Sequence, residues 1–583
     1  MFIDARGVEE GVVMHTTLCI IGGGVAGITL AREMEKAGIE TCLLESGGFT
    51  PDNATRDLYR GEYVGQPYSF ADGCRGRFLG GSSNCWGGWC RPLDPWDFEK
   101  RDWIPYSGWP FGLDEIAPYY ARTHSLLKLG PNNFDPAFWE TSIGRPDVRR
   151  IPFSSGKVRD TISQFSAPVR FGKAYRDELR RSQLIRVFLY ANAVDIQSDP
   201  QASTVTRIKV MTLSGRTMYV TAKLYVLATG GIENARLLLA SNKAAAAGVG
   251  NGNDLVGRFF MDHPRLLSGS VRFIREWSRN KLYDVKYHFH NAAVSAQGIR
   301  IASQFALIPE VLREERLLNA RVWLSSVFPG EESAGSYALH RYKQALLKKE
   351  QADWKWHKDM VTMLTNPIDT FGYGFSRIFH PRWLIKDVKF QAIVEPVPDP
   401  ESRVTLASSK DRLGMNRVRL NWRLGSQVQR TFDRTFALIA EELRGSGIAE
   451  VALDAPIEGG AWPPTLVKEG TWHHMGTTRM HDSPKLGVVD RNCLVHGMSN
   501  LYVAGSSVFP TAGANFPTIT IAALTLRLSD HIVQQLRYPK AVNLRGSVRD
   551  QSMPVVSAEE NISAAALVLG TNGAALRPSG DKP

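Results

Sequence analysis

Two polar residues late in the chain, His473 and Asn515, stand out as candidates for chemistry. His473 lies in an H-x-x-G-T run, and Asn515 comes just before Pro517, where a helix is expected to begin. An imidazole whose pKa lies near ambient pH can accept a proton from a reacting group. The adjacent His473 and His474 could instead suggest a metal site, but no third or fourth ligand follows at a useful spacing. We therefore expect no metal.

The start of the chain carries residues that could hold phosphate groups. A predicted strand ending at Ile21 leads into Gly22, Gly24 and Gly27, a G-x-G-x-x-G turn followed by helical spacing. The first glycine permits a tight turn, the second admits a pyrophosphate, and the third lets helix and strand pack closely. Glu45, at the end of the next predicted strand, is placed to accept hydrogen bonds from a ribose diol. This pattern predicts a dinucleotide site for FAD or NAD rather than NADP.

The composition is that of an ordinary globular protein. The chain has 583 residues, 43% hydrophobic and 22% charged, a length that suggests two or more domains. No apolar run is long enough to span a membrane and residues 1–15 lack signal-peptide features, so we expect a cytoplasmic protein. The six cysteines are interpreted as reduced thiols. The net charge of +12 is interpreted as a basic surface, and no nucleic-acid partner is expected.

Two further regions of the chain show a distinct organisation. Residues 73–111 are so rich in glycine that their backbone must wrap closely around something, and Arg77 is available there for a phosphate or flavin oxygen. From residue 265 to about 465, strand-like and helical segments alternate differently, which predicts a second domain built mainly on an antiparallel sheet. Strands are expected at 185–190, 204–212, 217–221 and 224–227, and a helix within 228–241.

Five motifs in order resemble the glucose-methanol-choline (GMC) oxidoreductases. They are the glycine turn with Glu45, the R-x-L-G-G-S-S-x-x-W-G run, and the segments 228–241, 254–264 and 471–532. The resemblance implies an α/β plus α+β protein, in which a Rossmann-like FAD-binding domain joins a substrate domain on an antiparallel sheet. It implies FAD as cofactor. The residues implied to bind it, besides Arg77 and those of the first motif, are Gly80, Gly81, Ser82, Asn84, Val194, Gly505, Ser506 and Thr518.

The resemblance also implies the chemistry. Carried over by position, His473 is the general base that removes a hydroxyl proton while hydride passes to flavin N5, and Asn515 holds the same oxygen. If the loop is aligned without a gap, Phe516 takes the place of Asn515. Cys85 stands where one branch carries a histidine bonded to flavin, and we interpret it as a free thiol.

The motifs look most like the pyranose oxidase and glycoside 3-oxidase or 3-dehydrogenase branch. This implies oxidation of a secondary ring hydroxyl of a sugar or glycoside to a ketone, with oxygen or a quinone or cytochrome as electron acceptor and room for a partner subunit. The alternatives are a sterol, choline or aliphatic alcohol oxidoreductase of the same fold, a non-redox flavin lyase, and a flavin-bearing subunit whose main task is docking.

The same pattern suggests domain boundaries. We assign residues 1–110, 182–264 and 466–538 to the FAD-binding domain and residues 111–181 and 265–465 to the substrate domain, and we expect 539–583 to be a disordered tail.

Two segments are given a structural interpretation. Asp262 and His263 are interpreted as hydrogen-bonded residues with separate partners, because neighbours on a strand point to opposite sides. Residues 337–383 are basic and rich in aromatic side chains. We interpret them as a helix with a solvated basic face packed on the domain core. The alternative is a docking surface for a membrane, a partner subunit or an electron acceptor.

Overall fold

The structure is a computed structural model that describes residues 1–68, 74–146, 148–167, 169–274, 281–284, 295–331, 333–346, 355–379, 381–456, 462, 466 and 471–538. The predicted tail at 539–583 lies outside these residues. Met1–Arg537 form one compact unit. Within the described ranges, no helix combines the length and the apolar content that crossing a membrane requires.

The first sheet grows from the glycine turn at the start of the chain. Its strand order is β1-β7-β3-β2-β10-β9-β8, with β20 beside β10. The strands are β1 (Phe2–Asp4), β2 (Val13–Ile21), β3 (Thr41–Leu44), β7 (Ile185–Leu189), β8 (Asn192–Ser198), β9 (Val205–Met211), β10 (Thr217–Leu227) and β20 (Leu501–Val503). The pairings from β1 to β10 and on to β20 are parallel, and β9 and β8 extend the sheet antiparallel. The two strands expected at 217–221 and 224–227 are one continuous strand.

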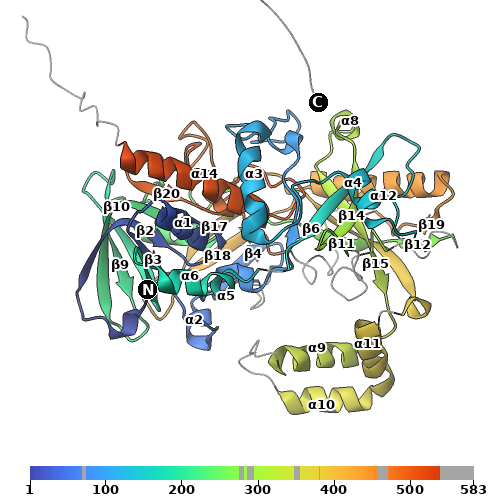
Figure 1. Ribbon diagram of the computed structural model, residues 1–583, viewed down its shortest axis with the longest axis horizontal. Helices are drawn as coiled ribbons and strands as arrows, with labels where there is room; N and C mark the ends of the chain where they lie inside the picture. The colour runs from blue at the N-terminus through green and yellow to red at the C-terminus, as the bar shows by residue number, and fades with distance from the viewer. Residues whose placement is uncertain are drawn as a thin grey trace, which may run out of the picture. The chain divides into compact units, whose positions relative to one another are not determined.

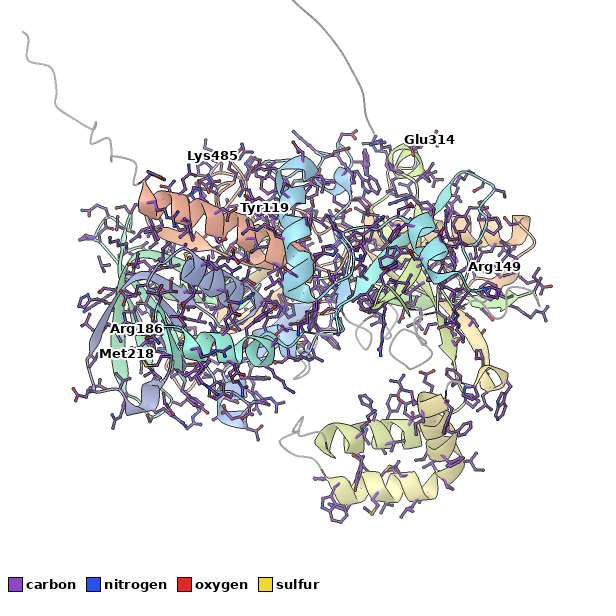
Figure 2. The ribbon with its side chains drawn as sticks, viewed as in Figure 1. Tyr119, Arg149, Arg186, Met218, Glu314 and Lys485 are labelled. Carbon is purple, nitrogen blue, oxygen red and sulfur yellow. The ribbon has the colours of Figure 1, made fainter. Side chains whose placement is uncertain are left out.

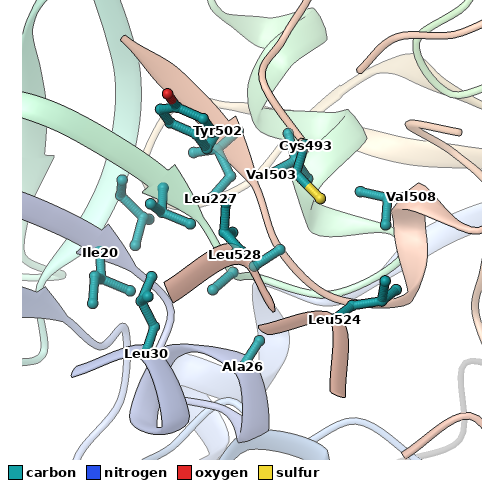
Figure 3. Packing of buried hydrophobic residues seen from close by; sticks show 14 of the residues in the cluster. Ile20, Ala26, Leu30, Leu227, Cys493, Tyr502, Val503, Val508, Leu524 and Leu528 are labelled. Carbon is teal, nitrogen blue, oxygen red and sulfur yellow. The ribbon is translucent and has the colours of Figure 1, made fainter. Parts of the chain in front are cut away.

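Helices cover this sheet and close its core. They include α1 (Val25–Lys36), α3 (Leu113–Leu127), α7 (Glu233–Ala240) and α14 (Thr518–Arg537), with the shorter α2 (Asn53–Asp57), α5 (Phe171–Ala174) and α6 (Arg176–Arg181). Leu30 of α1 and Leu524 and Leu528 of α14 meet strand residues such as Ile20 and Leu227 in the buried cluster of Figure 3. Because α14 packs against α1, the last helix of the chain is brought to the first glycine turn (Figure 1).

The second sheet is antiparallel throughout, as the sequence predicts. Its order is β11-β16-β15-β14-β6-β5, with β13 beside β14. The strands are β5 (Trp89–Cys90), β6 (Val158–Phe165), β11 (Arg265–Ser268), β13 (Ser295–Ala296), β14 (Ile299–Leu307), β15 (Ala320–Val327) and β16 (Asp387–Val394). The helix α12 (Ser426–Gly445) packs on it through Phe432 and Phe436, and α4 (Pro136–Ile143) and α8 (Pro309–Glu314) complete this half.

Two smaller sheets connect these parts. One pairs β12 (Ser270–Phe273) with β19 (Ala449–Ala452), and the other has the order β17-β18-β4, from Arg403–Lys410, Asn416–Trp422 and Gly61–Gly65. Both β4 and β5 come from the range assigned to the FAD-binding domain, but they pair with strands of the range assigned to the substrate domain. The boundaries given above therefore stay a prediction, and short strands cross them.

The basic aromatic segment forms three helices that pack on one another. These are α9 (Ala334–Leu346), α10 (Trp356–Thr365) and α11 (Pro367–Phe379), with α9 beside α10 in Figure 1. The interpretation of this segment as packed on the domain core is wrong for α11, since Ile368 is 86% exposed and Phe371 is 75% exposed. The inner side of α11 carries small residues instead, among them Gly374 and the buried Ser376.

Candidate active site

A cavity of about 490 Å³ brings together segments that are far apart in the sequence. Its walls come from the glycine turn, the glycine-rich segment 74–89, the end of β10 and the segment 471–521. Ten of the fifteen residues predicted for the site line this cavity: Gly22, Gly24, Glu45, Arg77, Gly81, Ser82, His473, Gly505, Ser506 and Thr518. One cavity therefore holds both the predicted nucleotide site and the predicted base.

The three glycines of the first turn have the geometry expected of them. Gly22 has a φ of +110°, and a Cβ there would lie 2.5 Å from the Ala228 carbonyl oxygen. A Cβ on Gly27 would lie 1.8 Å from the Gly22 carbonyl oxygen, so only glycine lets α1 start this close to β2. At Gly24 the nearest atom would be 4.0 Å away, which leaves its cavity side open to a ligand.

Glu45 is a buried carboxylate whose two oxygens are already partly used. Oε2 accepts from the Gly23 backbone N–H and Oε1 from the Gly47 backbone N–H, both at 2.9 Å. Burial raises its pKa, and these two hydrogen bonds lower it in turn. Each carboxylate oxygen has two lone pairs, so both can still accept from a ligand hydroxyl.

Arg77 is held beside the same part of the cavity. Its Nε donates to Ser46 Oγ at 2.7 Å, and its Nη1 lies 3.2 Å from a carboxylate oxygen of Glu233 at the start of α7. The guanidinium is therefore oriented before any ligand binds, and it shares the Glu233 carboxylate with Arg75 and Arg236.

The remaining predicted cofactor residues do not line the cavity. The Gly80 N–H donates to the Gly23 carbonyl oxygen at 2.8 Å and ties the glycine-rich segment to the first turn. The Asn84 amide donates to the carbonyl oxygens of Leu79 and Gly81 at 3.1 and 3.0 Å. Val194 packs in a small apolar cluster, while its neighbour Ala193 reaches the cavity. Their cofactor contacts, like that of Gly27, stay a prediction.

His473 forms a hydrogen bond with a second histidine that fixes which of its nitrogens carries hydrogen. Nε2 of His263 lies 2.8 Å from the Gly513 carbonyl oxygen, which can only accept, so this nitrogen carries the hydrogen. Burial lowers the pKa of His263 to about 4, so its Nδ1 is bare at neutral pH. That atom lies 2.9 Å from Nδ1 of His473, which must therefore donate. Nε2 of His473 is left as the proton acceptor.

The pKa of His473 lies well below the ordinary value for histidine, chiefly because the ring is buried and also because it faces His263 and Arg265. The ring is therefore neutral at neutral pH, in the form that can accept a proton. The adjacent His474 has a pKa lowered to about 3 by burial.

Asp262 holds the backbone that carries His473. Its Oδ1 accepts from the His473 backbone N–H and from Thr471 Oγ1, and its Oδ2 accepts from the Tyr68 hydroxyl, each at 2.7 Å. Burial raises its pKa to about 6. Trp472, between Thr471 and His473, lines the cavity and has a φ of +55°, which is a strained backbone conformation.

The interpretation of Asp262 and His263 as hydrogen-bonded residues is confirmed, and each has a partner of its own: the Tyr68 hydroxyl for Asp262 and the Gly513 carbonyl oxygen for His263. Their partners are not fully separate, however, because both residues also bind His473. They lie in an irregular stretch before β11 begins at Arg265, so the alternation of side chains along a strand does not apply. The sequence signal for this irregular stretch was Pro264 directly after the two polar residues, since proline often ends regular structure.

Asn515 is not brought to the cavity. Its side-chain amide donates to the Pro92 carbonyl oxygen at 2.8 Å and is 2% exposed. The next residue, Phe516, lines the cavity with its ring centroid 5.4 Å from that of His473. The role of Asn515 as partner of the base stays a prediction, and the described contacts place Phe516 beside His473 instead.

An aromatic wall stands next to His473. The ring of Phe516 stacks on Trp89 at 4.8 Å between centroids, and Trp323 lies 5.5 Å from Trp89. All three line the cavity, as does Arg265, whose guanidinium is 5.9 Å from the Trp323 ring. Cys85 also lines it, and all six cysteines are free thiols, as expected.

The cavity fits an FAD molecule on the evidence of its own residues. Gly24 is open toward it, Glu45 has lone pairs to spare, and the N-terminus of α14 at Thr518 offers backbone N–H groups to a negative charge. Within the part of the chain described, the buried Nε2 of His474 has no hydrogen-bond partner, although this residue lines the cavity. Fold and site together define a flavin-dependent oxidoreductase.

Comparison with known protein families agrees with this class. Residues 17–244 match the family described as FAD dependent oxidoreductase, and residues 398–525 match the family described as GMC oxidoreductase. The first match contains the glycine turn and Glu45, and the second contains His473 and Thr518. The chain therefore carries an FAD dependent oxidoreductase domain and a GMC oxidoreductase domain, and its cofactor is FAD.

Individual relatives are distant but match along most of the chain. 2-Methyl-1,2-propanediol dehydrogenase of Mycolicibacterium austroafricanum is 22% identical over 621 residues, which cover 93% of this chain and 99% of the relative. The fructose dehydrogenase large subunit of Gluconobacter japonicus is 21% identical over 599 residues, which cover 90% of this chain and 99% of the relative. The crystal structure of a formate oxidase shares the fold, with a TM-score of 0.51 at 16% identity over 91% of this chain and 99% of that one.

Proposed function

We propose that this protein oxidises a secondary ring hydroxyl of a sugar or glycoside to a ketone. The observation that carries the proposal is the hydrogen-bonded pair of His263 and His473, which presents a bare imidazole nitrogen in the cavity that fits FAD. FAD, when bound, supplies the acceptor for the hydride that leaves the carbinol carbon.

His473 takes the hydroxyl proton at Nε2, because its Nδ1 hydrogen is committed to His263. Loss of this proton from oxygen and of hydride from carbon leaves the ketone. Asp262 keeps the base in place by accepting from its backbone N–H. A base held in one position and one tautomer needs no reorganisation when the alcohol arrives.

The aromatic wall supports a ring-shaped substrate. A sugar ring exposes C–H groups on its faces and hydroxyls at its rim, so it can lie against the rings of Trp89, Trp323 and Phe516 while its hydroxyls meet polar groups. Since Phe516 also contacts His473, a ring lying on this wall has a hydroxyl within reach of the base. The relative named fructose dehydrogenase acts on a sugar, which agrees with this substrate class.

The test is reduction of the flavin by a substrate panel without oxygen. Sugars and glycosides should bleach the flavin absorbance, whereas sterols, choline and small aliphatic alcohols or diols should not. The substitution His473→Ala should abolish bleaching while FAD stays bound, and the control His481→Ala, which lies outside the cavity lining, should bleach normally.

Two outcomes would overturn this proposal. Bleaching by an aliphatic diol alone would assign the chain to the chemistry named for its relative from Mycolicibacterium austroafricanum. Bleaching at the normal rate in His473→Ala would remove His473 as the base. Adding oxygen, a quinone or a cytochrome to the reduced protein then identifies the electron acceptor by the rate at which colour returns.

A further inference from the structure

Large apolar side chains cover the outside of α10 and α11. We call the six residues that are each 64–86% exposed the apolar patch: Leu364, Ile368, Phe371, Ile378, Phe379 and Trp383. Its four members on α11 fall on one side of the helix, because 3.6 residues make one turn. The half-buried Phe375 joins them, with ring centroids 6.2 Å from Phe371, 4.8 Å from Phe379 and 6.4 Å from Trp383.

The side of α11 that contacts α9 includes the small residues Thr370 and Gly374. A Cβ on Gly374 would lie 3.6 Å from Leu339 of α9, and a Cβ on Gly335 of α9 would lie 2.3 Å from Thr370 Oγ1 of α11. The two helices approach closely through these glycines, while the large side chains turn outward. A helix packed on a protein core has the reverse arrangement. An exposed apolar surface of this kind marks a site of interaction.

Exposed cationic side chains accompany the apolar patch in the same stretch of the chain. Lys355, Lys358, Arg377 and Lys386 are exposed, and among the described residues 355–386 the only exposed carboxylate is that of Asp369. The other carboxylate of this stretch, on Asp359, is buried and accepts from Arg341 Nε at 3.0 and 3.1 Å, so its charge is neutralised. The exposed charges of residues 355–386, where the structure describes them, are therefore mainly positive.

We propose that the apolar patch docks on an anionic lipid surface. Helices that lie in the membrane interface combine Trp, Phe and aliphatic side chains on one face with Lys and Arg beside them. Tryptophan is favoured at the level of the headgroups, where Trp383 would lie. The lysines favour a lipid surface over a protein partner. Lysine is depleted in protein–protein interfaces, whereas it is attracted to anionic lipid headgroups.

The experiment is flotation of the full FAD-loaded protein with lipid vesicles. Vesicles of phosphatidylcholine containing phosphatidylglycerol should carry the protein upward, and pure phosphatidylcholine vesicles should carry much less. The double substitution Ile368→Ser with Phe371→Ser should lower the bound fraction at least about tenfold, because each removes an apolar side chain from the lipid. Lys355→Glu with Lys358→Glu should lower it by about fivefold or more for each charge.

Matched controls come from a loop outside the patch. Leu486→Ser removes an apolar side chain that is 40% exposed, and Lys485→Glu reverses the charge of a side chain labelled in Figure 2. Both should float like the unaltered protein. Every variant should keep its FAD and its flavin reduction by substrate, which shows that the fold is intact.

Three results would overturn the proposal. The unaltered protein could stay unbound with anionic vesicles. The patch variants could float as well as the controls. Sedimentation could instead show that the protein self-associates without lipid and that Ile368→Ser with Phe371→Ser abolishes this association, which would make the occupant a second copy of the chain.

Discussion

Replacing His263 by leucine tests how the base is positioned. His263→Leu replaces the imidazole by an apolar side chain of similar bulk. It removes the acceptor for the His473 Nδ1 hydrogen and the donor to the Gly513 carbonyl oxygen. His473 would then be free to carry its hydrogen on Nε2, the nitrogen that must accept the proton. The substitution therefore leaves His473 itself in place and changes only which of its ring nitrogens carries the hydrogen.

The size of the effect follows from the lost hydrogen bonds. One buried hydrogen bond contributes about 0.5–1.5 kcal/mol, so the correct tautomer loses a preference of up to about tenfold. Loss of orientation adds a comparable factor, since a misplaced reacting group can cost about a hundredfold. We expect flavin reduction about 10- to 100-fold slower. The Gly513 carbonyl oxygen, left buried without this donor, should lower the free energy of unfolding by about 1–3 kcal/mol.

The assay is the rate of flavin reduction under anaerobic, substrate-saturated conditions, measured with the FAD content of each variant. The matched control is His124→Leu, because His124 is also buried and bonds a backbone carbonyl oxygen, that of Gly130 at 2.7 Å, outside the cavity lining. It should lose stability without slowing flavin reduction. His263→Gln can still accept from His473 and donate to Gly513, so it should recover part of the rate.

A reduction rate in His263→Leu equal to that of the unaltered protein would refute the reasoning. An equal slowing in His124→Leu would also refute it, because the effect would then reflect general destabilisation.

Two further predictions concern Asp262 and Gly27. Burial raises the pKa of Asp262 to about 6, so its carboxylate is protonated as the pH falls through this value, and the charge-assisted hydrogen bond that holds the His473 backbone is weakened. The turnover number should fall below about pH 6, and Asp262→Asn, which cannot titrate, should lack this acidic limb; an unchanged limb would exclude Asp262 as its source. The contribution of Asp262 to stability changes with pH in the opposite direction to the turnover number. Because its pKa is higher in the folded state, this group stabilises the folded state fully below the ordinary aspartate pKa of about 4, and the stabilisation is lost as the pH rises through about 6. Gly27→Ala would be stabilising by up to about 1 kcal/mol in an unobstructed helix, but here the new Cβ meets the Gly22 carbonyl oxygen at 1.8 Å. Thermal unfolding should show a loss of about 1–3 kcal/mol together with FAD release, and a stabilised protein would contradict the close approach.

The local parts of the nucleotide site could be predicted from the sequence. The strand, the glycine turn, α1 and Glu45 lie within a short stretch, and each follows from the spacing of glycines and apolar residues. His473 could be found in the same way, because its motif resembles that of a known family. These features depend on neighbouring residues, so the rest of the fold changes them little.

Contacts between distant segments were decided by the tertiary structure alone. His263 and His473 are 210 residues apart in the chain, and no periodicity predicts that their rings meet. Phe516 and not its neighbour Asn515 faces the cavity. Which of the two faces it depends on a distant contact, because the Asn515 side chain is bonded to the Pro92 carbonyl oxygen.

The helix α11 shows the same division. Its sequence by itself determines an amphipathic helix, since the apolar residues recur at helical spacing. Periodicity gives a helix an apolar side but does not say where that side faces. Only the packing of Gly335 and Gly374 between α9 and α11 turns the large side chains outward. The sequence therefore determined the cofactor, the candidate base and the helices. The tertiary structure decided which residue bonds to His473 and which surface is left exposed, because both depend on contacts between segments far apart in the chain.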